Sequence, residues 1–335
     1  MKKQIVLVIF VSLLCIMSIL SDTQAEPVTI RFSSSMPPHN FMTKQCMEWA
    51  KLVEQNSDGE CKVQIFDSAQ LYKDNELIKA IQTGAVDSGM MGSPWLGTQL
   101  IPTLRVFQMP FLFQTMDDMI NVYQSKIGGR WKETAEKKGV KVMGLIVHPS
   151  PEDQLIAAIK PLKVPADIKG MTIRVIGPDD AAVIKKWGAA PSFIPGMDVY
   201  PSLQRGTIQG CIGSVMLQVE LKRYEVAPYA VFLPLAGAQA YYGMNKEFFD
   251  KLTPKQQKAI FDASAAMEKR TKEMTMRDLA VNMEELKKKM KGLYMPTPEE
   301  TAQWKEGVAD MWPQLVGDNK ELADTLEETR AILGR

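Results

Sequence analysis

The chain has 335 residues, of which 40 are Lys or Arg and 39 are Asp or Glu, and 45% of the residues are hydrophobic. These proportions are typical of a folded soluble protein and exclude disordered and fibrous classes. At roughly 150 residues per domain, the length predicts about two domains. A formal net charge of +1 gives no basic surface, which argues against nucleic acid as the main partner.

The N-terminus has the pattern of an export signal. Lys2 and Lys3 precede an apolar run over residues 5–17, and the small residue Ala25 suits signal peptidase. A membrane anchor is the alternative, but it needs about 20 apolar residues, and no second apolar span follows. We predict that residues 1–25 form a signal peptide cleaved near Ala25, and that the mature protein is soluble in a bacterial periplasm.

The mature chain would keep the cysteines Cys46, Cys61 and Cys211. An oxidising compartment permits a disulfide between Cys46 and Cys61, with Cys211 buried and free. Three unpaired core cysteines are the alternative. The four cysteines of the whole chain are too few for a disulfide scaffold, so both possibilities stay open.

The first half of the mature chain alternates strand and helix patterns. Residues 28–32 and 62–66 alternate apolar and polar side chains, as half-buried strands do. A short helix over 77–81 can end at Gly84, which suits a left-handed C-cap, and a buried strand follows over 140–147. This alternation predicts βαβ units and a mostly parallel sheet.

Two loops interrupt this alternation and predict a hinge. His148-Pro149-Ser150-Pro151 contains two prolines, which break regular structure. The alternation then resumes, with predicted strands over 155–159, 171–176 and 192–195 and a helix over 180–187. A second loop over 233–237 precedes a strand over 239–244. We therefore predict two α/β lobes joined by at least two crossings.

The C-terminal part is helical. Thr253 can cap a helix, with Pro254 in its first turn and Gln256 closing a capping box. The helix can extend to Gly292, which would make it about 55–60 Å long at 1.5 Å per residue. We predict that it lies across the back of both lobes. Two shorter helices, near 298–312 and 320–333, end the chain.

One face of this long helix stays apolar at intervals of seven residues. The positions are Ile260, Met267, Met274 and Val281. A coiled-coil dimer through this face is the alternative to packing within one chain.

The sequence contains no recognisable catalytic constellation. His39 and His148 are the two histidines, and no Cys or His lies at metal-ligand spacing. Nucleophile-elbow, dinucleotide and phosphate-loop motifs are absent from the sequence. The two adjacent aspartate pairs, at 117–118 and 179–180, suit helix first turns better than an acid/base dyad. We predict a protein that is not an enzyme and uses no metal or cofactor.

Several stretches, in this order and spacing, carry a family resemblance. They are Glu76 to Asp87, Pro110-Phe111-Leu112-Phe113 after Pro102-Thr103-Leu104, Ile168 to Val175, Tyr200 to Gly206, and Leu252 to Gln257. From about residue 27 to the C-terminus, the chain resembles the substrate-binding protein of tripartite ATP-independent periplasmic (TRAP) transporters.

The resemblance implies an α/β fold, a two-lobed type II periplasmic binding protein with a hinge and a long back helix. The expected lobes are 26–150 plus 238–279, and 151–237 plus 280–335. Such proteins bind an organic acid between the lobes and deliver it to integral membrane subunits; we expect a monomer. The alternatives are a receptor for an ATP-driven importer or a sensor kinase, a periplasmic enzyme on the same fold, and a structural dimer.

The resemblance also implies the site residues. Arg174 is the expected carboxylate-binding arginine, whose planar fork can hold a carboxylate with two parallel hydrogen bonds. Gln154 stands where many members have a second arginine. Gly213 stands where many have asparagine, with Ser214 next to it.

Further candidates lie in segments that line this family's cleft. They are Phe66, Met90, Trp95 and Met216, each of which could instead belong to the core, and His39 could line the cleft as well. Because Gln154 and Gly213 leave a second charged end of a ligand without a partner, we predict a monocarboxylate with an apolar or aromatic body.

Overall fold

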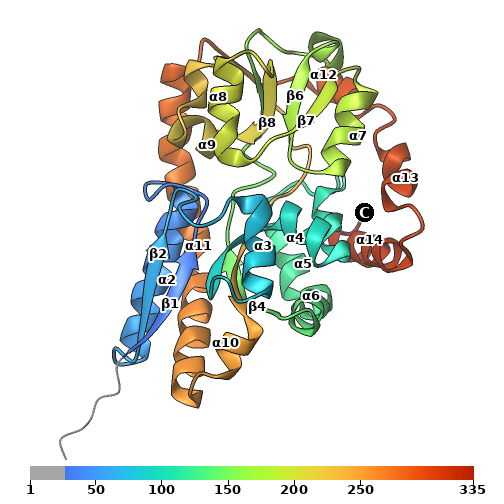
Figure 1. Cartoon of the computed structure of the whole chain (residues 1–335). Helices are drawn as coiled ribbons and strands as arrows, with labels where there is room; N and C mark the ends of the chain where they lie inside the picture. Colours follow the sequence, from blue (N-terminus) through green and yellow to red (C-terminus); the bar gives the residue numbers. More distant parts are fainter. Residues whose placement is uncertain (1–26) are drawn as a thin grey trace, which may run out of the picture.

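The computed structural model describes residues 27–335, so the predicted signal peptide lies outside the described residues. Two mixed sheets form the centres of two lobes, one above the other in Figure 1. The first sheet, in the order β2-β1-β3-β10-β4, consists of β1 (Val28–Ser33), β2 (Cys61–Phe66), β3 (Ser88–Gly92), β4 (Val140–Ile146) and β10 (Ala240–Asn245). The second, in the order β11-β9-β5-β8-β6-β7, consists of β5 (Gln154–Ala158), β6 (Thr172–Val175), β7 (Ala190–Phe193), β8 (Gly210–Ser214), β9 (Tyr229–Phe232) and β11 (Gly292–Tyr294).

The sheets are less parallel than the sequence pattern predicts. β1 pairs in parallel with β2 and β3, but β10 runs antiparallel to both β3 and β4. In the second sheet, β5 runs antiparallel to β8 and β9. β5 and β10 are the strands that follow the two crossings. A strand that arrives from the other lobe begins at the end of its sheet that faces that lobe. The parallel strands finish at that same end, so the arriving strand runs opposite to them.

Helices cover both sheets. Those between the strands of the first lobe are α2 (Phe41–Asn56), α3 (Asp74–Gln82), α4 (Ser93–Gln99), η1 (Pro102–Gln108), α5 (Met116–Gln124) and α6 (Lys126–Lys137), and α10 (Lys246–Asp250) follows its last strand, β10. Those of the second are η2 (Pro165–Ile168), α7 (Pro178–Lys186), η3 (Gly196–Asp198), α8 (Val199–Gln204), α9 (Val215–Glu220) and η4 (Arg223–Glu225). The chain continues with α11 (Pro254–Lys289), α12 (Pro298–Lys305), η5 (Ala309–Met311), α13 (Trp312–Val316) and α14 (Lys320–Leu333). Within residues 27–335, none of these helices combines the length and the apolar character that a membrane span requires.

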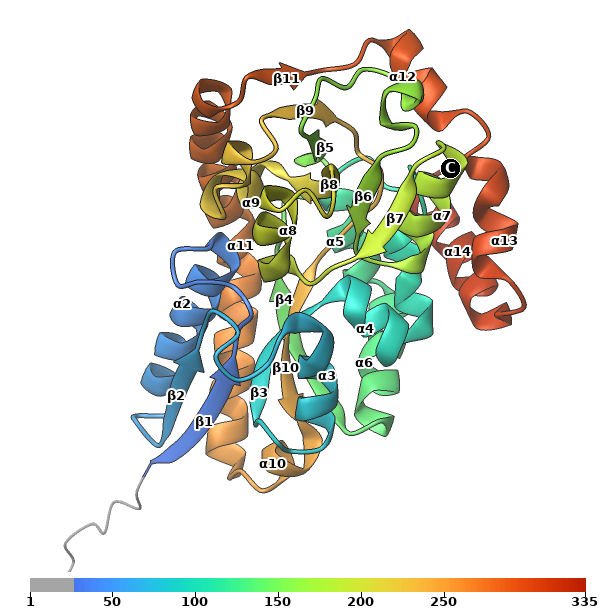
Figure 2. The ribbon, with the colours of Figure 1, turned by 45° about the horizontal axis from the view of Figure 1, so that its top comes forward.

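The long helix α11 joins the lobes, as predicted. Its capping box is confirmed: the Thr253 side chain accepts a hydrogen bond from Gln256 N, and the Gln256 side chain accepts one from Thr253 N. The helix contacts α2 and β4 of the first lobe and α9 of the second, and Figures 1 and 2 show it running from one lobe to the other. It ends at Lys289 rather than at Gly292, which instead begins β11.

The seven-residue apolar repeat of α11 does not form one continuous seam. Ile260 and Met267 are fully buried within the first lobe, whereas Val281 is 65% exposed. A straight α-helix drifts by about 20° per heptad relative to a perfect repeat, so the third heptad has turned to solvent. Leu286 instead faces inward and packs in the second lobe. The face that a coiled-coil dimer requires is therefore largely used inside this chain.

The C-terminal segment differs from the expected pattern. The helix predicted over 298–312 is broken, because α12 ends at Lys305 and Gly307 adopts a positive φ of 61°. The helix α14 has the predicted limits and packs against η1 and α5 of the first lobe. The division of the chain into lobes stays a prediction, and these contacts favour counting α14 with the first lobe rather than the second.

The three cysteines of the described residues are all buried and free. Cys46 and Cys61 lie in one apolar cluster with Trp49. Burial raises the pKa of the Cys46 thiol far above its ordinary value, which keeps it protonated and unreactive. The disulfide alternative is therefore wrong, and the cysteines act as small apolar core residues.

Candidate functional site

A pocket lies between the two sheets, at the ends of β1, β3 and β6. Ligands of open α/β sheets bind outside the carboxyl ends of the strands, and the pocket of about 110 Å³ occupies this position. The first lobe contributes Ser35, Met36, Met42, Asp74, Met90, Gly92, Pro94 and Trp95. The second lobe and the crossings contribute Arg174, Ile176, Gly196, Leu217, Arg223, His148, Ala238 and Gln239, and Ala240 comes from the start of β10.

Arg174 lies in the pocket wall, as predicted. Its side chain leaves β6 and is 3% exposed. Nε donates a hydrogen bond to the Ile194 carbonyl at 2.9 Å, and Nη1 donates to the Ile212 carbonyl at 3.3 Å. Burial lowers the pKa of Arg174, but a guanidinium remains charged in proteins. Two neutral carbonyls thus fix the orientation of this cation without neutralising it.

Arg223 is a second pocket arginine, which the sequence analysis missed. It lies at the start of η4, directly after Lys222 in left-handed conformation, and is 1% exposed. Nη2 donates to the Gly196 carbonyl at 2.7 Å, while Nε and Nη1 are buried without a partner among the described residues. Burial lowers the pKa of Arg223 to about 10. Lys222 and Arg223, two adjacent basic residues in a loop, resemble a solvated surface pair, so no local pattern indicates that Arg223 is buried.

The charges in the pocket leave a positive excess. Arg174 and Arg223 each carry one positive charge, and Asp74, whose Oδ2 accepts a hydrogen bond from Gly196 N at 3.5 Å, carries one negative charge. His148 is neutral, because burial lowers its pKa to about 3. Two positive charges and one negative charge give a net charge of +1. Opposite charges attract strongly where water is excluded, so the pocket suits an anion.

The walls opposite the arginines are apolar. Met90 and Trp95 line the pocket as the sequence predicted, and Met36 and Met42 extend this surface. Met90 comes from β3, and Trp95 lies in the first turn of α4. These side chains can cover the body of a ligand whose charged end lies at the arginines.

Three other predicted residues lie outside the pocket lining. Phe66 is the last residue of the edge strand β2. Met216 is fully buried in the core, and its neighbour Leu217 faces the pocket instead. The His39 ring bonds through Nε2 to the Glu220 carbonyl at 2.9 Å, so it joins the lobes at the surface.

Gln154, Ser214 and Gly213 also lie outside the lining, for local reasons. The Gln154 side-chain oxygen accepts a hydrogen bond from Ala236 N at 2.8 Å, which holds the second crossing. The Ser214 hydroxyl caps α9 by accepting from Leu217 N. Gly213 lies directly behind Arg223, since a Cβ atom built on it would be 3.7 Å from Arg223 Nη1.

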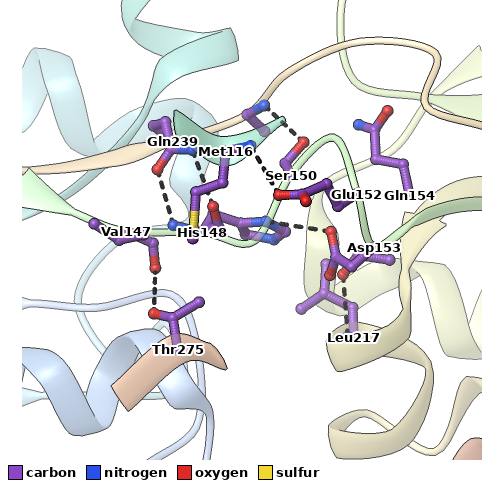
Figure 3. A network of polar contacts seen from close by, with 12 residues as sticks. Met116, Val147, His148, Ser150, Glu152, Asp153, Gln154, Leu217, Gln239 and Thr275 are labelled. Atoms are coloured by element: carbon purple, nitrogen blue, oxygen red, sulfur yellow. Dashed lines mark hydrogen bonds and ion pairs between the residues drawn. The ribbon is translucent and has the colours of Figure 1, made fainter. Parts of the chain in front are cut away.

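The two crossings are tied together next to the pocket, as Figure 3 shows. The Gln239 side chain accepts a hydrogen bond from His148 N at 2.8 Å and donates one to the His148 carbonyl at 3.0 Å. His148 Nδ1 lies 3.7 Å from the fully buried Asp153. Burial raises the pKa of Asp153 to about 7, so its carboxyl is protonated below neutral pH while His148 is uncharged. Residues 148 and 239 therefore form one connected hinge.

Contacts across the cleft hold the lobes close to each other. Arg105 of η1 donates two hydrogen bonds to the buried carboxylate of Asp179 in α7, at 2.5 and 3.1 Å. The Glu220 carboxylate of α9 accepts from Asn40 Nδ2 at 2.7 Å, at the start of α2. Within residues 27–335, no group of three or more His, Cys, Asp or Glu residues is arranged to hold a metal ion.

Two lobes, a double crossing and a charged pocket between them define a ligand-binding protein of the two-lobed type. Residues 32–318 match the family DctP, described as bacterial extracellular solute-binding protein, family 7. The match covers most of the chain, which therefore belongs to this family. The resemblance to TRAP substrate-binding proteins and the predicted fold are confirmed.

Relatives and solved structures agree with this assignment. The chain is 26% identical over 295 residues to the C4-dicarboxylate-binding periplasmic protein DctP of Rhodobacter capsulatus, covering 84% of each protein. A TRAP periplasmic solute-binding protein from Shewanella oneidensis with bound succinate superposes with a TM-score of 0.85 at 23% identity, over 91% of this chain and 99% of that one. A similar protein from Chromohalobacter salexigens with bound D-glucuronate gives a TM-score of 0.84 at 20% identity, over 90% and 99%. These two identities are low, so the structures show the shared fold.

Proposed function

We propose that this protein is a periplasmic receptor that binds a small organic carboxylate between its lobes and delivers it to the integral membrane subunits of a TRAP transporter. One observation carries the proposal: two buried arginines and one aspartate give the pocket a net positive charge at the ends of the strands. Arg174 would bind the carboxylate, since its backbone contacts fix its orientation and it forms no salt bridge with a carboxylate of the described residues.

The family supports this ligand class and this compartment. The relatives described above are named for C4-dicarboxylates or hold succinate and D-glucuronate, all of which are organic acids. The basic and apolar start of the chain supports export, with a signal peptide cleaved near Ala25. The packing of α11 on both lobes supports a monomer.

The narrower prediction of a monocarboxylate with an apolar body is not part of this proposal. It depended on the absence of a polar partner for a second hydrophilic end of the ligand. Asp74 lines the pocket and can accept a hydrogen bond from a hydroxylated end, and Arg223 adds a second positive charge to the lining. The acids named for the relatives, a dicarboxylate class and a sugar acid, give the narrower prediction no support.

A thermal-shift panel on protein stripped of ligand tests the proposal. The panel contains succinate, D-glucuronate, D-galacturonate, 4-methyl-2-oxopentanoate and phenylpyruvate, with succinamide and D-glucose as uncharged counterparts. At least one acid should raise the Tm in a concentration-dependent way, and the uncharged compounds should not. Equal stabilisation by an acid and its uncharged counterpart, or no stabilisation by any acid, would contradict the proposal.

A further inference from the structure

We infer that Arg223 is the second cation that holds the ligand's carboxylate, and that Gly213 provides the space in which it lies. This inference rests on the proposed function, because it specifies how the same pocket binds an organic acid. It assigns a binding role to a residue of the η4 turn, outside both the strands and the motifs that carry the family resemblance.

The first observation is the hydrogen bonding of Arg223. The residue is 1% exposed and lines the pocket, but Nε and Nη1 are buried without a partner among the described residues. By contrast, Arg105 of η1 is paired with the buried carboxylate of Asp179 through two hydrogen bonds. Burying an unpaired charge is costly, so the free donors of Arg223 indicate a missing anion.

The second observation is the position of Arg223 relative to Arg174. Arg174 donates to the Ile194 carbonyl, and Arg223 donates to the Gly196 carbonyl, two residues further along the same segment. Both guanidinium groups therefore lie at one end of the pocket. Their positive charges repel each other, and the charge of Arg174 lowers the pKa of Arg223. A carboxylate between them would offset this repulsion and accept hydrogen bonds from both guanidinium groups.

The third observation concerns the backbone behind Arg223. A Cβ atom at Gly213 would lie 3.7 Å from Arg223 Nη1, which is already van der Waals contact, so a longer side chain would enter the volume of the guanidinium. The neighbouring strand β5 pairs with β8, the strand of Gly213. On β5, the Gln154 side-chain oxygen already accepts a hydrogen bond from Ala236 N. Neither Gln154 nor Gly213 therefore presents a polar side chain to the ligand at this end of the pocket, and Arg223 of the η4 turn takes that position.

Isothermal titration of the mature protein tests the role of Arg223. The probes are succinate, D-glucuronate, D-galacturonate, 4-methyl-2-oxopentanoate and phenylpyruvate, each titrated into wild type, Arg223→Met and Arg223→Lys. For every acid that the wild type binds, Arg223→Met should weaken binding by about thirty-fold or more, and Arg223→Lys should weaken it less. The Tm of ligand-free Arg223→Met should equal or exceed that of the wild type, because the substitution removes an unpaired buried charge.

The outcomes separate the inference from the function on which it rests. Arg223→Met that binds an acid within threefold of wild type overturns the inference alone. A lower ligand-free Tm with unchanged affinity also overturns it, because Arg223 would then only anchor Gly196. A wild type that binds none of the acids overturns both the inference and the proposed function.

A second substitution tests the space behind the arginine without removing the charge. Gly213→Asn should weaken binding about tenfold or more by displacing the guanidinium from its position beside Arg174. Gly129→Asn is the matched control, because a Cβ at Gly129 in α6 meets nothing within 4 Å; it should leave the affinity unchanged. Equal affinities for the two variants would show that Gly213 does not position Arg223.

Discussion

The two sides of the pocket differ in chemistry. The second lobe presents the cations Arg174 and Arg223, whereas the first lobe presents mainly apolar side chains, with Asp74 as its one carboxylate. The charged side can recognise an anion by itself, but a charge pair is weak while water surrounds it. The apolar side removes this water only when the lobes meet. We infer that the second lobe selects a negatively charged ligand, and that the first lobe strengthens the charge pair by excluding water from it.

The largest effect should follow from removing the main cation of the charged side. We expect Arg174→Ala to weaken acid binding by about 2–5 kcal/mol, which is roughly thirty-fold to several thousand-fold. Titration calorimetry with the same acids measures the change. Arg277→Ala, at an exposed position on α11 with 70% of its side chain accessible, is the control and should bind like wild type. Binding of Arg174→Ala within threefold of wild type would make Arg174 a structural residue.

A second prediction concerns the contact that brings the two sides together. Arg105→Ala leaves the Asp179 carboxylate, which is fully buried, without its cation across the cleft. Because Arg105 is partly exposed, we expect a loss of about 2–3 kcal/mol in unfolding free energy, below the range for a fully buried pair. Urea denaturation measures it. The double variant Arg105→Ala/Asp179→Asn should recover part of the loss, and failure to recover any would show that the pair is not coupled.

The free energy of unfolding should depend on pH through Asp153, which lies next to the hinge. Burial raises the pKa of its carboxyl from 3.8 to about 7, so the folded state holds a proton that the unfolded chain releases above about pH 4. The stability from this group is therefore present at low pH and is lost as pH rises toward 7. His148 acts in the opposite direction: its lowered pKa removes stability as pH falls below the ordinary histidine value.

Comparing Asp153→Asn with wild type isolates the carboxyl, because His148 is present in both. The variant should gain roughly 2 kcal/mol relative to wild type between pH 5 and pH 8. Urea unfolding at the two pH values measures this gain. A difference between the two proteins that does not change with pH would show that Asp153 is ionised throughout.

The apolar side should contribute less than the charged side. We expect Trp95→Ala to weaken binding by about tenfold, since an aromatic contact adds about 0.5–1.5 kcal/mol beyond the area that it buries. The same titrations measure it. If Trp95→Ala weakened binding more than Arg174→Ala did, the charged side would not contribute most of the affinity.

The smallest effect should lie at the back of the molecule. Val281 on α11 is 65% exposed, so Val281→Lys should change the unfolding free energy by no more than about 0.5 kcal/mol. Light scattering should give the mass of a monomer for both proteins. A wild-type dimer that Val281→Lys converts to monomer would restore the coiled-coil alternative for this helix.

Features that depend on neighbouring residues could be predicted from the sequence, whereas features that depend on contacts between distant segments could not. Periodicity and capping residues predicted α14 and the start of α11, because these features depend on neighbours within a few residues. Arg174 was found because its motif is local. Arg223 was not, because its burial results from the Gly196 carbonyl and the Gly213 backbone, which approach it only in the folded chain. The antiparallel entry of β5 and β10 likewise depends on the direction from which the chain arrives, which no local pattern records.

Native mass spectrometry tests directly whether the protein binds one small organic acid through Arg174. The mature protein is purified without refolding, and its mass is compared before and after denaturation, alongside Arg174→Ala. We predict that wild type, as purified or after incubation with the five acids, carries one small organic acid that denaturation releases and that Arg174→Ala lacks. An identical bound acid in Arg174→Ala, a bound molecule without an acidic group, or no acid bound to wild type after incubation would contradict it.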